Sequence, residues 1–162
     1  MLIRTARADD HVEISELALR SKSYWGYSDA FLDACRAELT YPPAVCASGT
    51  SWVVVDGPTL LAVSVVEGQP PIGELTGFFV DLPVIGTGCG RLLMTHTLHA
   101  AEQHGFTELV LDADPGAESF YERFGARRSG STPSNLIPGR LLPRMSLVLN
   151  RCSTTTPGET HP

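Results

Sequence analysis

Three glycines within five residues constrain this chain most strongly, because they stand between a predicted strand and a predicted helix. Gly86, Gly88 and Gly90 follow an apolar run over residues 72–80 and precede residues 91–104, where apolar side chains recur at helical spacing. Glycine allows a tight turn and a close approach of the backbone to a ligand. The first turn of a helix carries unpaired N–H groups and a partial positive charge. The segment therefore predicts an anion site suited to phosphate, with a turn that binds no ligand as the alternative.

Length and composition indicate one folded domain. The chain has 162 residues, of which 43% are hydrophobic, so it is able to bury a core. Its formal net charge of −6 argues against a general nucleic-acid binder and against a polybasic membrane anchor. We find no apolar run of membrane-spanning length and no signal-peptide pattern at the N-terminus, so we expect a soluble, cytoplasmic protein.

The C-terminal part has a different charge balance. Residues 123–151 contain six arginines and no acidic residue. This segment is either a solvated strand surface that balances the acidic remainder or a patch that meets an anion.

Cysteine and histidine spacing gives no sign of a metal. The four cysteines form no CxxC pair, and the five histidines form no HExxH motif. We predict free thiols, with Cys35 and Cys89 buried, and no metal ion.

The order of predicted elements defines a fold class. Hairpin-like pairs of strands stand next to strand–helix–strand units, which predicts an α/β (α+β) domain. We expect a mixed, mostly antiparallel sheet of about six or seven strands over residues 1–150, with helices on both faces, followed by a disordered tail at 151–162. The predicted strands are 2–6, 51–55, 60–66, 72–80, 107–111, 127–131 and 144–149, and the predicted helices are about 10–22, 29–39, 91–104 and 115–124.

Two common phosphate-binding motifs do not fit the glycine segment. A P-loop requires a lysine after its glycines, and the only lysine of the chain is Lys22. The dinucleotide fingerprint GxGxxG requires a glycine where Arg91 stands, and it opens the first strand–helix unit of its domain.

Two segments resemble the GNAT superfamily of acyl-CoA-dependent N-acyltransferases. Residues 78–93 are similar to the strand of that family and its [RQ]xxGx[GA] signature, although Ile85 stands at the Arg/Gln position. Residues 114–126 are similar to its Asn-x-x-Ala-x-x-Phe-Tyr-x-x-x-Gly-Phe element, with Asp114 and Ala126 as departures. The resemblance covers about residues 1–150 and implies acetyl-CoA, or another acyl-CoA, as co-substrate. The residues it implies at the cofactor are Phe79, Val80, Ile85, Gly86, Thr87, Gly88, Cys89, Gly90, Arg91, Asp114, Ala117 and Phe120.

Amide formation from a thioester requires a neutral amine, a donor for the oxyanion and a proton for the departing thiolate. The resemblance assigns the oxyanion to a backbone N–H near Val80. Tyr121, a phenol with a pKa of about 10, is the candidate general acid, with a helix-core residue as the alternative. Glu74 is the candidate base, because its even spacing from Val80 places both side chains on one face of a strand. A solvated glutamate is the alternative, since many members of the family use a water chain.

The acceptor site is assigned to residues outside the two motifs. The resemblance places Trp25 and Tyr27 in one wall of the acceptor pocket. Arg140 is a candidate partner for an acceptor carboxylate, with an exposed loop arginine as the alternative. Cys89 has no nearby base and is interpreted as a packed thiol.

These observations predict an N-acetyltransferase that acts by direct attack in a ternary complex. The acceptor is a primary amine of a small molecule, an amino acid-like compound or a peptide, and a homodimer is possible. The alternative is a non-catalytic acyl-CoA-binding or regulatory domain of the same fold.

Overall fold

A single seven-stranded sheet organises residues 1–149, the part of the chain that the computed structural model describes. The strand order is β1-β2-β3-β4-β5-β7-β6, and every neighbouring pair is antiparallel except β4 and β5. The expected mixed, mostly antiparallel sheet is confirmed. The predicted tail at 151–162 lies outside the described residues.

The strands are β1 (Leu2–Thr5), β2 (Ser51–Asp56), β3 (Thr59–Glu67), β4 (Ile72–Val80), β5 (Glu108–Asp112), β6 (Arg127–Pro133) and β7 (Leu141–Val148). The helices are α1 (His11–Lys22), α2 (Asp29–Cys35), α3 (Pro43–Cys46), α4 (Cys89–Gln103) and α5 (Glu118–Glu122). Short 3-10 turns are η1 (Ala8–Asp10), η2 (Ser23–Trp25), η3 (Leu82–Val84) and η4 (Pro115–Ala117).

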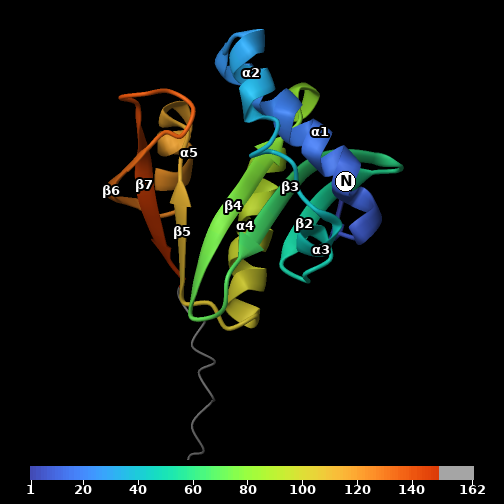
Figure 1. Cartoon of the computed structure of the whole chain (residues 1–162). Coiled ribbons are helices and arrows are strands. Elements are labelled where there is room, and N and C mark those ends of the chain that lie inside the picture. Colours follow the sequence, from blue (N-terminus) through green and yellow to red (C-terminus); the bar gives the residue numbers. More distant parts are fainter. Residues whose placement is uncertain (150–162) are drawn as a thin grey trace, which may run out of the picture.

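Helices cover both faces of the sheet, as predicted (Figure 1). One core lies beneath α1 and α3 and contains Ile14, Leu17 and Val63. The other lies beneath α4 and α5 and contains Leu93, Met94 and Tyr121. No helix in the described part of the chain is long and apolar enough to cross a membrane.

Local sequence signals explain most element boundaries. Ser28 caps α2 by accepting from the N–H of Phe31, and Asp114 caps η4 by accepting from the N–H of Gly116. Gly105 has a φ of +93° directly after the end of α4, a conformation that favours glycine.

Several predicted boundaries are wrong. The helix expected to reach residue 39 ends at Cys35, and the short helix α3 was not expected after Pro42. The loop expected over 133–143 is shorter, because β6 extends to Pro133 and β7 begins at Leu141. Pro143 is compatible with β7, because its missing N–H does not prevent its carbonyl from accepting from the N–H of Ala113.

The sheet opens between β4 and β5. The parallel pairing covers only Ile72–Glu74 of β4 against Glu108–Val110 of β5. Beyond this point β4 continues to Val80 while β5 diverges from it, so the two strands form a V (Figure 1). The opening leaves one backbone edge of β4 without a strand partner.

Candidate active site

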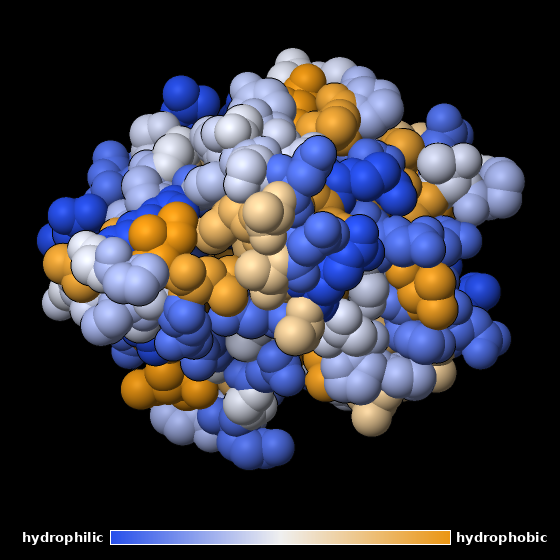
Figure 2. All heavy atoms as spheres, turned by 45° about the horizontal axis from the view of Figure 1, so that its top comes forward, coloured by the Kyte–Doolittle hydropathy of each residue, from blue (hydrophilic) through white to orange (hydrophobic). Residues whose placement is uncertain are grey.

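A cavity of about 910 Å³ occupies the opening between β4 and β5. It is lined by residues 75–80 of β4, by Leu111 and Asp112 of β5, and by the glycine segment at one end. Figure 2 turns this end of the molecule toward the viewer and shows apolar and strongly hydrophilic side chains side by side around the middle of the face. The cavity is therefore shaped by the break in the sheet.

Most of the residues predicted for the site line this cavity. They are Trp25, Phe79, Val80, Ile85, Gly86, Gly88, Gly90, Arg91, Asp114, Ala117, Phe120, Tyr121 and Arg140. Tyr27, Glu74, Thr87 and Cys89 are not among the lining residues.

The glycine segment presents free amides at the start of α4. Gly86 and Gly88 have φ values of +80° and +92°, which explains why glycine stands at both positions. Gly90 lies close to β4, since a Cβ there would be 3.3 Å from Val80 Cγ2. Within residues 1–149, the N–H groups of Gly86, Gly88, Cys89, Gly90 and Arg91 donate to no protein acceptor. These amides, at the positive end of the 15-residue helix α4, are suited to bind an anion.

Backbone geometry identifies which amides of β4 face the cavity. The N–H of Asp81 donates to the carbonyl of Leu61 on β3, so the N–H groups of alternate residues, Val80 and Phe78, point to the other side. The N–H of Val80 donates to the Ser21 hydroxyl at 3.2 Å. The N–H of Phe78 faces the open edge, where the pairing with β5 has already ended.

Tyr121 lies on α5 with its ring in the core. The ring packs edge-on against Phe78 and Phe120, at centroid distances of 6.2 and 5.3 Å. Its hydroxyl makes no hydrogen bond with any described residue, although Tyr121 lines the cavity. Burial, followed by the charge of Asp114, raises the pKa of Tyr121 above its ordinary value. The phenol is therefore protonated at neutral pH.

Glu74 lies on the face of the sheet opposite Val80, which corrects the expectation of a shared face. A β-bulge at Thr76 inverts the alternation, because Val65 pairs with Gly77 and the next residue of β3, Val66, pairs with Leu75. The Glu74 carboxylate is 2.9 Å from an Arg144 guanidinium nitrogen.

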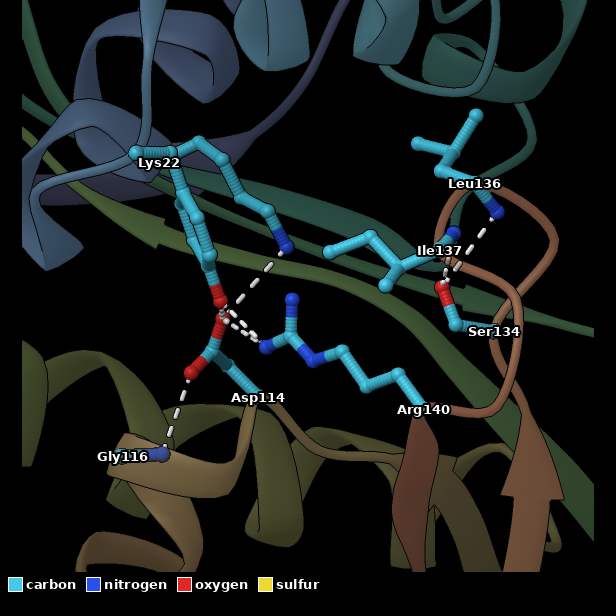
Figure 3. A network of polar contacts seen from close by, with 8 residues as sticks. Lys22, Asp114, Gly116, Ser134, Leu136, Ile137 and Arg140 are labelled. Atoms are coloured by element: carbon cyan, nitrogen blue, oxygen red, sulfur yellow. Dashed lines mark hydrogen bonds and ion pairs between the residues drawn. The ribbon is translucent and has the colours of Figure 1, made fainter.

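An ion cluster that includes Lys22, Asp114 and Arg140 lines another part of the cavity (Figure 3). Asp114 Oδ2 accepts from the Tyr27 hydroxyl at 2.5 Å and lies 3.5 Å from Lys22 Nζ and 3.7 Å from an Arg140 nitrogen. Arg140 also donates to the Tyr27 hydroxyl. Burial, followed by the hydrogen bond to Asp114, raises the pKa of Tyr27. The cluster joins α1, the segment after it, η4 and the β6–β7 loop.

Trp25 contacts the same part of the molecule from the segment between α1 and α2. A Cβ at Gly116 would be 2.6 Å from the Trp25 ring, so the indole lies directly against this glycine. Trp25 and Tyr27 therefore bridge the opening of the sheet, since both contact residues that follow β5.

Three of the C-terminal arginines, Arg128, Arg140 and Arg144, are paired with acids in the described part of the chain. Arg128 binds Glu118 at 3.0 Å, and Arg144 binds both Glu74 and Asp112. These pairs support the interpretation that Arg128 and Arg144 balance acidic residues, whereas Arg123 and Arg140 line the cavity.

Sequence reasoning missed three contributors to the site. Lys22 was considered only when a P-loop was ruled out, and Ser21 and Thr76 belong to no motif. Gly77 in the interior of a strand is a signal for a bulge and would have indicated the inversion.

The buried cysteines and the potential metal-ligating side chains of residues 1–149 form no second functional site. Cys35, Cys46 and Cys89 are free and buried, and burial raises the pKa of the Cys89 thiol. Residues 1–149 contain no group of three His, Cys, Asp or Glu side chains that could hold a metal ion.

The chain belongs to the GNAT acetyltransferase family, since residues 48–135, more than half of the sequence, match the family model described as "Acetyltransferase (GNAT) domain". The resemblance read from the two motifs is thus confirmed, and acetyl transfer is the general activity that this membership supports. No curated protein matches the sequence of this chain.

Solved structures share the same fold. PaiA N-acetyltransferase from Thermoplasma acidophilum, in complex with coenzyme A, has a TM-score of 0.69 at 16% identity over 91% of this chain and 98% of its own. The ribosomal-protein-S18-alanine N-acetyltransferase of Escherichia coli has a TM-score of 0.68 at 16% identity over 99% and 98% of the two chains. YncA from Salmonella typhimurium, with its cofactor acetyl-CoA, has a TM-score of 0.64 at 18% identity over 93% and 95%.

Proposed function

We propose that this chain is an N-acetyltransferase that moves the acetyl group of acetyl-CoA to a primary amine by direct attack in a ternary complex. The observation that carries the proposal is the continuous cavity between β4 and β5, which joins the free amides of the glycine segment to Tyr121 and to the Asp114 cluster. That PaiA and YncA were crystallised with coenzyme A or acetyl-CoA supports the choice of co-substrate.

The glycine segment is suited to the pyrophosphate of the co-substrate. The free amides of residues 86–91 offer several donors to phosphate oxygens without a lysine. Arg91 and Arg123 line the same cavity and add positive charge. From this end the pantetheine arm extends along the unpaired edge of β4, whose backbone offers hydrogen bonds of the kind that a neighbouring strand would make.

The reaction centre is assigned to the part of the cavity around Phe78 and Tyr121. The N–H of Phe78 stabilises the oxyanion that forms when the amine nitrogen attacks the thioester carbon. The carbon–sulfur bond then breaks, and the Tyr121 hydroxyl gives its proton to the departing thiolate. The proton lost by the attacking amine leaves through water, and Tyr121 is reprotonated from solvent.

Glu74 acts on the amine only through water in this proposal. Its carboxylate is ion-paired with Arg144 and does not line the cavity, so direct contact with the amine is disfavoured. The same observation favours the second candidate function, a non-catalytic acyl-CoA-binding domain, because no free carboxylate base is assigned beside the thioester.

The acceptor is assigned to the part of the cavity lined by Trp25 and Arg140, with Tyr27 behind it as a hydrogen-bond partner of Arg140. Lys22 and Arg140 carry two positive charges against the one negative charge of Asp114, so the cluster retains a charge that suits an acceptor carboxylate. An amino acid-like compound or a peptide with an acidic group next to its amine fits this charge. One structural neighbour is a ribosomal-protein-S18-alanine N-acetyltransferase and another is an N-acetylglutamate synthase, which supports keeping both kinds of acceptor in the test.

The experiment is release of CoA thiol from acetyl-CoA in the presence of single amines, amino acids and short peptides. Each amino acid is tested beside its amide, which keeps the amine and removes the carboxylate. We expect turnover with the carboxylate form and a rise of about 10-fold or more in KM for the amide or for the Arg140→Gln variant. Arg127→Gln, an exposed arginine of β6, is the matched control and leaves KM unchanged. Binding of CoA in calorimetry with no turnover for any acceptor favours the second candidate, and tight NADH binding without CoA binding refutes both.

A further inference from the structure

The β-bulge in β4 is held from outside the cavity by a tyrosine that no motif identifies. At the bulge Thr76 has no partner on β3, because Val65 pairs with Gly77 and Val66 pairs with Leu75. The carbonyl of Thr76 instead accepts a hydrogen bond from the Tyr41 hydroxyl at 3.0 Å. Tyr41 lies between α2 and α3 and is only 5% exposed.

Tyr41 is fixed at both ends. Its backbone N–H donates to the Ser15 hydroxyl of α1 at 2.9 Å, and its ring stands edge-on to Phe79 at a centroid distance of 6.4 Å. Burial raises the pKa of its hydroxyl, which is therefore protonated and acts as a donor.

Gly77 leaves the space that the Tyr41 hydroxyl occupies. A Cβ at Gly77 would be 2.6 Å from the Tyr41 oxygen and 3.3 Å from Val65 Cγ2. The glycine and the tyrosine are therefore complementary, and a side chain at residue 77 would displace the hydroxyl from the bulge.

The bulge carbonyl and the proposed oxyanion donor belong to adjacent peptide groups. The peptide plane of the Thr76 carbonyl and that of the Phe78 N–H meet at the Cα of Gly77. Glycine restricts its two flanking peptide planes less than any other residue does. The hydrogen bond from Tyr41 holds the first plane, and the pairing of Gly77 with Val65 holds the second, so together they limit the freedom that glycine gives to this pair.

From this geometry we infer that Tyr41 is a positioning residue for catalysis, which holds the Thr76 carbonyl and thereby aims the N–H of Phe78 at the thioester oxygen. The inference rests on the proposed function, since it assigns the oxyanion to Phe78. If Tyr41 only satisfied a buried carbonyl, its hydroxyl would stabilise the fold. Removing the hydroxyl would then leave the polarisation of the thioester carbonyl unchanged. The two roles therefore differ in a measurable property of the bound co-substrate.

The test is the Tyr41→Phe variant, which removes one hydroxyl and keeps the ring. Infrared difference spectra of bound acetyl-CoA carrying ¹³C at the thioester carbonyl report how strongly that carbonyl is polarised. We expect the stretch to lie below its value in water in the wild type and to move back toward that value in Tyr41→Phe. We also expect kcat to fall by about 10- to 100-fold, less than the loss when an oxyanion donor is removed outright. The Kd of CoA stays within about 2-fold, because the phosphate-binding amides of the glycine segment are a separate set.

Thr97→Val is the matched control for the loss of a buried hydroxyl. Thr97 is fully buried on α4, and its hydroxyl bonds to Ser64 at 2.7 Å away from the cavity lining. We expect this variant to melt at a lower temperature with an unchanged carbonyl stretch and kcat. Should Tyr41→Phe not fold, Gly77→Ala displaces the same hydroxyl from the other side and is expected to give the same spectral change.

Two failures are distinguishable in this experiment. A carbonyl stretch that is lowered in the wild type and equally lowered in Tyr41→Phe, with equal kcat, overturns the role of Tyr41 alone. A wild-type stretch that equals its value in water refutes the proposed oxyanion site, and the role of Tyr41 with it.

Discussion

Replacing Asp114 by asparagine tests whether the ion cluster stabilises the folded protein. Asparagine is the residue that the family pattern has at this position, and it keeps an oxygen that accepts from the N–H of Gly116. It loses the charge that faces the Tyr27 hydroxyl, Lys22 and Arg140. Two cations are then left near each other without their shared anion.

The expected loss of stability follows from three contacts. A hydrogen bond to a charged group contributes about 1.5–3 kcal/mol. The two ion pairs, at 3.5 and 3.7 Å, have side chains that are 12–23% exposed and so are partly screened. Such pairs add roughly 0.2–1 kcal/mol each. The neutral amide of the variant retains a weaker hydrogen bond to Tyr27, so we expect a net loss of about 2–3 kcal/mol in the free energy of unfolding.

Thermal unfolding of the unliganded protein measures this loss. For a domain of this size, 1 kcal/mol shifts Tm by roughly 2–4 °C, so Asp114→Asn is expected to lower Tm by about 5–10 °C. Asp33→Asn is the matched control, because Asp33 pairs with Arg36 where both side chains are more than 60% exposed. Its Tm should stay within about 2 °C of the wild type. Equal Tm values for Asp114→Asn and Asp33→Asn would refute the stabilising role of the cluster.

Further predictions concern the acid, the glycine segment and an ion pair of the fold. Tyr121→Phe is expected to lower kcat by about 100-fold without lowering Tm, and the wild-type kcat should show no decline below about pH 10, because its raised pKa keeps Tyr121 protonated. Gly88→Ala forces a φ of +92° on a residue with a side chain. It should weaken CoA binding in calorimetry and lower the free energy of unfolding by about 1–2 kcal/mol. Gly130→Ala, at a glycine without a positive φ, should change neither quantity. The hydrogen bond to Arg4 lowers the pKa of Asp10, so its stabilisation is present above the unfolded pKa and is lost as the pH falls through the folded value. Asp10→Asn should therefore be less stable by about 1–3 kcal/mol at pH 7 in urea unfolding, with the difference shrinking below about pH 4.

The parts of the fold that local sequence signals determine were predictable. The bounds of β4 match the predicted run over residues 72–80, because turn residues flank it on both sides. The glycine segment and α4 were predicted to within two residues, since the glycines and the helical periodicity are both visible in the sequence. The direction of pairing between β4 and β5 follows from the helix that connects them.

The contacts that build the site depend on residues far apart in the chain. Tyr41 bonds to Thr76 across 35 positions, and Tyr27 bonds to Asp114 across 87. No period or turn pattern in the sequence refers to such a distance. Asp114 caps η4, but its second role in the ion cluster depends on where the segment after α1 crosses the opening of the sheet.

The opening of the sheet exposes backbone groups that a continuous sheet would pair, and the molecule satisfies these groups selectively. An unpaired N–H or C=O that is shielded from water is costly, so each one on the free edge of β4 needs a partner. The Ser21 hydroxyl accepts from the N–H of Val80, and the Tyr41 hydroxyl donates to the carbonyl of Thr76. Among the described residues, the N–H of Phe78 has neither a strand nor a side chain as partner on this edge. It lies between the two satisfied groups, on the residue whose ring packs against the ring of Tyr121, so the donor that the fold leaves open belongs to a residue in contact with the proposed acid.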